Sequence, residues 1–132
     1  MCNYEKFSTR LSNLAANDKQ KDFLKRLNET IENHMERCET DIPSIASSLN
    51  LHPSKLRRDI KALTGITPAH YIAYIRFGRV LNMMTDFPHY SMAKIAETCG
   101  FADHAHFTHS FRRMFQTTPL HYKKSLQLKS IE

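Results

Sequence analysis

The chain has 132 residues, of which 41% are hydrophobic and 24% charged, and its formal net charge at pH 7 is +6. This size and composition suit one soluble globular domain or two small lobes. No apolar run is long enough to span a membrane, and the N-terminus lacks a signal-peptide core. We therefore expect a cytoplasmic protein with reduced cysteines and no membrane contact by this segment. Glycine is rare and no alternating strand pattern occurs, which predicts an all-α fold.

The positive charge is concentrated in one part of the chain. Residues 1–52 carry 7 Lys and Arg against 8 Asp and Glu, a net charge of −1, whereas residues 53–124 carry 11 against 4, a net charge of +7. Such an excess favours a polyanionic partner. A solvated basic surface without a partner is the alternative that composition leaves open.

The N-terminal part begins with residues 1–17, whose weak periodicity predicts a linker or tail. Residues 18–38 are predicted to form a helix with Asp18 as its N-cap, because an apolar stripe recurs there at helical spacing. The stripe consists of Phe23, Leu24, Leu27, Ile31 and Met35. It either packs against the helices that follow or forms a dimer interface.

A first helix-turn-helix is predicted from residue 42 to residue 64. Asp41 should cap a short helix over residues 42–48, and residues 49–52 should form the turn. Pro53 suits the first turn of the second helix, because its missing N–H needs no partner there, and Gly65 suits the C-terminus. The expected core side chains of this helix are Leu56, Ile60 and Leu63.

A long helix should connect this unit to a second helix-turn-helix. Thr67 and Pro68 favour its start, and it should end near Asp86, so that its roughly 19 residues span about 28 Å. In the second unit, Ser91 and Asp103 are the expected N-caps and Gly100 allows the sharp turn between the helices. The expected buried residues are Phe107, Phe111 and Met114, and a last short helix follows Thr118 and Pro119.

The two units repeat each other in sequence. The matches in the first helix and turn lie at an offset of 50: they pair Ile45, Ala46, Leu49 and Leu51 with Ile95, Ala96, Cys99 and Phe101. The later matches lie at an offset of 51: they pair Leu56, Ile60, Thr67, Pro68, His70 and Tyr71 with Phe107, Phe111, Thr118, Pro119, His121 and Tyr122. We therefore predict two helix-turn-helix subdomains joined by a long central helix, about seven helices in all. The first unit with its connecting helix covers residues 18–86, the second covers residues 87–126, and residues 127–132 form a tail.

The motif residues of the second unit and of the long helix match a known family. They are Ile95-Ala96, Gly100-Phe101, Phe107, Phe111-Arg112, Thr118-Pro119 and Tyr122, together with Thr64-Gly65, Pro68, Tyr71-Ile72 and Arg76. On these positions, residues 42–122 resemble the DNA-binding domain of the AraC/XylS transcriptional regulators. The departures are Gln116 and Thr117 where a Gly is usual, Val80 where Ala is common, and Lys123 and Lys124 where Arg is frequent.

The resemblance implies a sequence-specific regulator of transcription that binds double-stranded DNA through two recognition helices in successive major grooves. Further candidate partners are RNA polymerase and a sensing or receiver domain in a longer parent chain. The rival interpretation is a protein-interaction module on the same scaffold without specific DNA binding, against which the charge of residues 53–124 argues.

The candidate DNA-binding residues lie on the second helix of each unit. They are Ser54, Lys55, Arg57, Arg58 and Lys61 in the first unit, and His104, Ala105, His106, Thr108, His109, Arg112 and Arg113 in the second. The resemblance implies base contacts at Ser54, Arg58, Ala105, His106 and His109. Arg58 can donate two hydrogen bonds to guanine, whereas Ala105 offers only apolar contact, so the first unit should discriminate more strongly. We expect contacts to DNA phosphates from Arg112, Lys94 and Thr67 and from the backbone amides at the helix starts.

Catalysis, cofactors and metals are not expected. The chain has no Gly-rich phosphate loop, no paired carboxylates in an apolar setting and no nucleophile with a recognisable base. His104 and His106 do not share a helix face, and no Cys or carboxylate completes a metal site with His109. We expect Arg76 to pair with Glu97 or a nearby carbonyl, and His70 and His121, which lie near helix starts, to have a capping or packing role.

Overall fold

The computed structural model describes residues 18–37 and 39–131, and in these residues it contains seven helices and no strand, as predicted. The helices are α2 (Asp18–Met35), α3 (Ile42–Ser48), α4 (Pro53–Thr64), α5 (Pro68–Asp86), α6 (Met92–Thr98), α7 (His104–Phe115) and α8 (Pro119–Ile131). The predicted linker or tail over residues 1–17 lies outside the described residues. No helix in the described part is both long and apolar enough to cross a bilayer.

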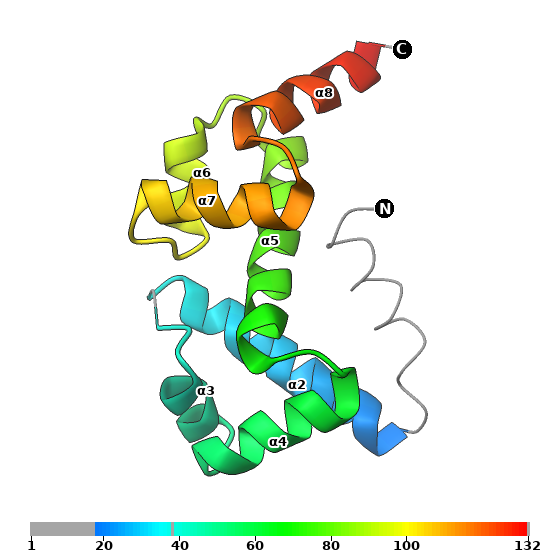
Figure 1. Ribbon diagram of the computed structural model, residues 1–132, viewed down its shortest axis with the longest axis vertical. Helices are drawn as coiled ribbons and strands as arrows, with labels where there is room; N and C mark the ends of the chain where they lie inside the picture. Colours follow the sequence, from blue (N-terminus) through cyan, green and yellow to red (C-terminus); the bar gives the residue numbers. More distant parts are fainter. Residues whose placement is uncertain (1–17, 38, 132) are drawn as a thin grey trace.

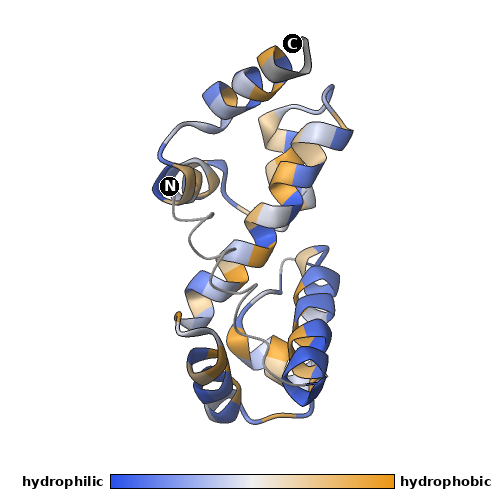
Figure 2. Ribbon diagram, turned by 90° about the vertical axis from the view of Figure 1, so that its right-hand side faces the viewer, coloured by the Kyte–Doolittle hydropathy of each residue, from blue (hydrophilic) through white to orange (hydrophobic). Residues whose placement is uncertain are grey.

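The long helix α5 connects two groups of helices (Figure 1). One group contains α2, α3 and α4, and the other contains α6, α7 and α8, so the predicted pair of helix-turn-helix units is confirmed. The apolar faces of the helices turn toward one another (Figure 2). They form one continuous core, in which Phe77 of α5 is only 1% exposed and lies among the rings of Phe101, Phe107, Phe111 and Phe115.

Three helix boundaries differ from the sequence prediction. Asp18 lies inside α2 instead of capping it, and α2 ends at Met35 instead of residue 38. It ends early because the carbonyl of the buried His34 accepts from the amides of Arg37 and Glu39, and the His34 ring bonds the Glu39 carbonyl at 2.9 Å and Ser48 Oγ at 2.7 Å. Helix α8 continues to Ile131, through most of the residues assigned to a tail, since no Gly or Pro interrupts it.

The predicted N-caps that follow are present. Side-chain oxygens of Asp41, Ser91, Asp103 and Thr67 each accept a hydrogen bond from a backbone amide in the first turn of α3, α6, α7 and α5. The two hydrogen bonds that Ser44 donates to the Asp41 carboxylate, at 2.8 and 3.1 Å, lower the pKa of that group. These caps fix where each helix starts, because they satisfy amides that have no partner within the helix.

The repeat extends to the backbone, because residues with positive φ occur at matching positions of the two units. The turns contain Asn50 (φ 56°) and Gly100 (φ 84°), and the helix ends contain Gly65 (φ 76°) and Gln116 (φ 63°). Gln116 stands near the position where the family usually has a glycine, yet it takes the left-handed conformation. Its amide donates to the Arg112 carbonyl at 2.8 Å, as that of Gly65 donates to Lys61 at 2.9 Å. The turn is therefore kept without glycine.

Candidate nucleic-acid interface

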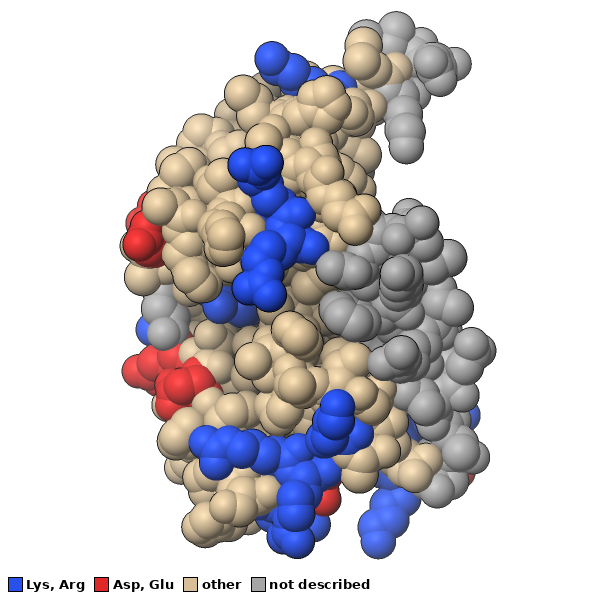
Figure 3. Space-filling model, in the orientation of Figure 1, with Lys and Arg blue, Asp and Glu red and all other residues tan. Residues whose placement is uncertain are grey.

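The second helices of the two units, α4 and α7, lie on the same face of the molecule. Both face the viewer in Figure 1 and run from left to right, one below the other. Figure 3, in the same orientation, shows one group of Lys and Arg side chains over α4 and another over α7, with acidic side chains mainly at the left-hand edge. The structure therefore brings the two candidate surfaces together on one side of the protein.

Helix α4 is held by its buried side and presents its polar side to solvent. Leu56 and Ile60 are fully buried, as predicted, whereas Leu63 is only half-buried. On the outer side, Ser54, Arg57 and Arg58 are exposed, and the two guanidinium groups make no hydrogen bond or ion pair with any residue that the structure describes. Both arginines are thus available to an external partner.

The start of α4 has a cap that the sequence analysis missed. Nδ1 of His52 accepts a hydrogen bond from the Ser54 amide at 3.1 Å, so this ring nitrogen must be unprotonated. The signal was present in the repeat, because His52 lies 51 residues before Asp103, which caps α7. Each candidate recognition helix therefore begins at a fixed cap, and the amide that each cap binds belongs to an exposed residue, Ser54 or Ala105.

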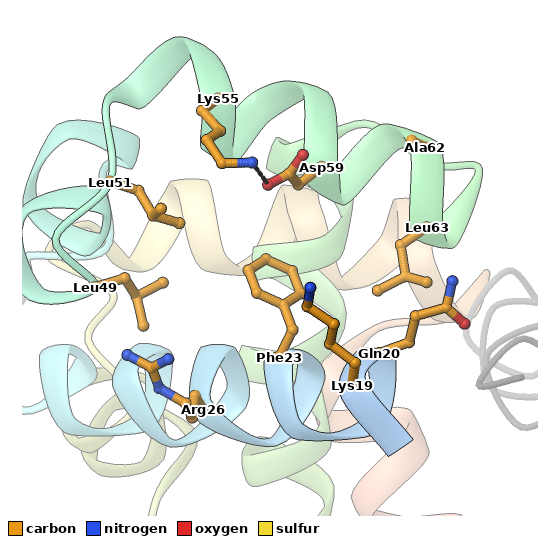
Figure 4. A pocket seen from close by; sticks show the side chains of 10 residues that line it. All are labelled: Lys19, Gln20, Phe23, Arg26, Leu49, Leu51, Lys55, Asp59, Ala62 and Leu63. Carbon is orange, nitrogen blue, oxygen red and sulfur yellow. Dashed lines mark hydrogen bonds and ion pairs between the residues drawn. The ribbon is translucent and has the colours of Figure 1, made fainter. Parts of the chain in front are cut away.

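Two lysines of the predicted set are engaged within the protein. Lys55 Nζ lies 2.9 Å from the Asp59 carboxylate, one helical turn further along α4. The Lys55 side chain also lines, together with Phe23 and Leu49, a groove of about 620 Å³ between α2 and α4 (Figure 4). Lys61 Nζ donates to the Gly65 carbonyl at 3.1 Å, at the end of its own helix. An exposed ion pair such as Lys55–Asp59 contributes only about 0–1 kcal/mol. Both lysines are exposed, so their ammonium groups can exchange these partners for a phosphate.

Helix α7 presents a more varied surface than α4. The exposed members of the predicted set are His104, Ala105, His106, His109, Arg112 and Arg113, whereas Thr108 is half-buried. The ring of His104 lies 6.1 Å from that of Phe107, and the ring of His106 lies 6.5 Å from that of Phe101. These two imidazoles therefore rest at the edge of the aromatic core. His109, by contrast, lines a polar hollow with the two arginines.

Arg76, His70 and His121 lie outside the two candidate recognition helices. Arg76 bonds a carbonyl, as predicted: its Nη2 donates to the Gly100 oxygen at 2.7 Å. The backbone amides of His70 and His121 bond the capping hydroxyls of Thr67 and Thr118, but both imidazoles are exposed. The caps at the starts of α5 and α8 thus use the backbone of these histidines. Among the described residues, no three His, Cys, Asp or Glu side chains group closely enough to hold a metal ion.

Most of the chain is similar to a known family of domains. A family model described as a helix-turn-helix domain matches residues 45–125. The HTH-type transcriptional activators RhaS of Salmonella arizonae and Salmonella newport are 34% identical over 76 residues, which are 58% of this chain and 27% of each relative. The chain therefore spans about a quarter of the length of the curated relatives that it matches.

Solved structures share the fold. The C-terminal domain of AraT, a response regulator from Geobacillus stearothermophilus, has a TM-score of 0.69 and 25% identity, covering 76% of this chain and 83% of its own. The DNA-binding domain of AdpA, solved with a target DNA, has a TM-score of 0.66 and 21% identity, covering 78% of this chain and 94% of its own. Because the family model matches more than half of the chain, the protein belongs to this helix-turn-helix domain family, of the AraC type that its motifs resemble.

Proposed function

We propose that this chain is the DNA-binding part of a transcription regulator and that α4 and α7 enter successive major grooves on one side of the duplex. The observation that carries the proposal is the placement of two basic helices on one face with the same direction. The 19 residues of α5 span about 28 Å, whereas successive major grooves on one side of DNA are about 34 Å apart. A connecting helix of this length can hold α4 and α7 near the groove separation. If their spacing is slightly shorter than that of the grooves, the DNA must bend to meet both, at about 1–6 kcal/mol.

The proposed contacts divide into groups that contact bases and groups that contact phosphates. Arg58 is exposed, without a partner in the described residues, and can donate two parallel hydrogen bonds to O6 and N7 of guanine. Ala105 can contact only an apolar group such as a thymine methyl. The proposed DNA-binding residues remain Ser54, Lys55, Arg57, Arg58, Lys61, His104, Ala105, His106, Thr108, His109, Arg112 and Arg113. Of these, Arg112 is assigned to phosphate, and the first unit is expected to dominate discrimination.

A pair of substitutions at one residue tests the role of Arg58. Arg58→Ala should weaken binding to a site selected from random duplexes by about 1–3 kcal/mol and relax the preference at one position. Arg58→Lys is the matched control, because it keeps the charge and loses the planar fork. It should keep the affinity for random DNA while relaxing the same position. If Arg58→Ala weakens selected and random DNA equally, Arg58 contacts a phosphate and its assignment to a base is wrong.

The rival function is a protein-interaction module without specific DNA binding. A salt titration on random DNA separates the two, because each phosphate contact releases counterions and makes the affinity fall steeply with salt. An affinity that is weak and nearly independent of salt would favour the rival.

RNA polymerase and a sensing or receiver domain are proposed as further partners. The support is that RhaS is named a transcriptional activator and is about four times as long as the matching segment, and that AraT is named a response regulator.

A further inference from the structure

The turn of the second helix-turn-helix contacts the first group of helices directly. Gly100 is buried, and a Cβ atom added to it would lie 2.6 Å from the carbonyl oxygen of Met35, the last residue of α2. The carbonyl of the same glycine accepts the hydrogen bond from Arg76 of α5. Two backbone segments of different units and the connecting helix therefore meet at one residue.

Arg76 joins this turn to α5 in two ways. Besides its bond to Gly100, its guanidinium carbon lies 3.7 Å from the centroid of the Phe101 ring. Phe101 in turn packs against Phe77 of α5 at 5.4 Å and Phe107 of α7 at 5.0 Å. Hydrogen bonds from an ionised donor and cations over aromatic rings are among the stronger polar contacts in proteins. Arg76 thereby links the connecting helix to the segment immediately before α7.

The first unit lacks a comparable contact at the matching position. Asn50 lies 50 residues before Gly100 and also has a positive φ, but it is exposed. Both turns need a residue in the left-handed conformation. At Gly100, the end of α2 also lies so close that a side chain would not fit. The glycine therefore reflects contact between the units, in addition to the shape of the turn.

The second helix-turn-helix is joined to α5 by a covalent connection and by non-covalent contacts. The covalent connection between α5 and α6 is the loop of residues 87–91, which is mostly exposed. The non-covalent connections are the packing of Phe77 among the aromatic rings of the second unit and the contacts of Arg76 and Met35 with the turn. We propose that Arg76 is a positioning residue that fixes the separation of α4 and α7, and so restricts binding to one spacing between the halves of the DNA site. This inference rests on the proposed DNA-binding function.

A spacing series tests the proposal on DNA. The site selected by the wild type is rebuilt with one base pair inserted or deleted between its halves, which shifts one half by about 3.4 Å and about 35°. The control is Arg79→Ala, because Arg79 is also basic and half-buried and lies about one turn further along α5. On the altered sites, the affinity of the wild type and of Arg79→Ala should fall roughly tenfold or more, as for a mismatched position. Arg76→Ala should bind the original site less tightly than the wild type, but its affinity should fall by less than about threefold when the spacing changes.

Different results would overturn the proposed function and the positioning role of Arg76. A wild type that selects no site in two halves overturns the proposed function itself. Arg76→Ala losing affinity by the same factor at every spacing overturns only the positioning role, since a purely structural defect would do this. If Arg76→Ala does not fold, Arg76→Met takes its place, because it keeps an apolar contact with Phe101 and removes the hydrogen-bond donors.

A distance measurement without DNA gives an independent readout. Spin labels are attached at Ser47→Cys on α3 and Glu97→Cys on α6, both exposed positions outside the proposed site. Cys2 and Cys38 are replaced by serine, and Cys99 is kept because it is fully buried. The distance distribution between the labels should be narrow with Arg76 present and in the Arg79→Ala control, and broader in Arg76→Ala or Arg76→Met. Equal widths in all four proteins would overturn the proposal.

Discussion

Replacing Gly100 by alanine should destabilise the protein strongly, because residue 100 combines a backbone conformation and a close contact that favour glycine. Its φ is 84°, and a left-handed conformation costs an L-residue about 1–2 kcal/mol. The added Cβ would also lie 2.6 Å from the Met35 carbonyl oxygen, well inside van der Waals contact. Overpacking of this kind costs about 1–3 kcal/mol, so the free energy of unfolding should fall by about 2–5 kcal/mol.

Asn50→Ala is the matched control, since Asn50 occupies the equivalent turn with φ 56° and is exposed. In Asn50→Ala, the free energy of unfolding should fall only by the cost of the left-handed conformation, at most about 1–2 kcal/mol. Urea unfolding of both variants and the wild type gives the two losses directly. Gly100→Ala should be the more damaging by at least about 1 kcal/mol. Equal losses would refute the reasoning, because they would show that the contact with α2 contributes nothing.

Two further predictions concern Gln116 and the histidines of α7. Gln116→Gly should raise the free energy of unfolding by about 0.5–1 kcal/mol. Glycine removes the steric cost of the left-handed backbone, and the larger conformational entropy that glycine loses on folding offsets part of this gain. A lower urea midpoint would contradict this prediction. Binding to the selected site should weaken in the variant that combines His104→Ala, His106→Ala and His109→Ala, because the DNA loses the hydrogen-bonding ring nitrogens of three exposed side chains. An unchanged affinity would place these histidines away from the DNA.

Much of the fold could be predicted because its signals are local in sequence. Asp41, Ser91 and Asp103 cap the helices that they precede, and a capping side chain bonds an amide only two or three residues away. The buried phenylalanines of α7 follow from helical periodicity alone. Local signals were also overlooked: Lys55 and Asp59 are four residues apart on one helix, a spacing that favours the ion pair observed.

What could not be predicted depends on contacts between distant segments. The end of α2 is set by the His34 ring, which reaches Ser48 in the next helix. The sequence indicates that Gly100 forms a sharp turn, but its approach to Met35 follows only from the packing of α2 against the second unit. The relative placement of α4 and α7, on which the candidate site depends, is likewise a tertiary property, although the repeat predicts that both helices exist.

The measurement that tests the central claim most directly is methylation interference at guanine N7 on the selected site, because N7 lies in the major groove. Two recognition helices in successive major grooves predict two clusters of interfering guanines about 10–10.5 base pairs apart on one side of the duplex. Arg58→Ala should remove interference in one cluster and leave the other. A single cluster of interfering guanines would contradict the proposal that α4 and α7 bind DNA together.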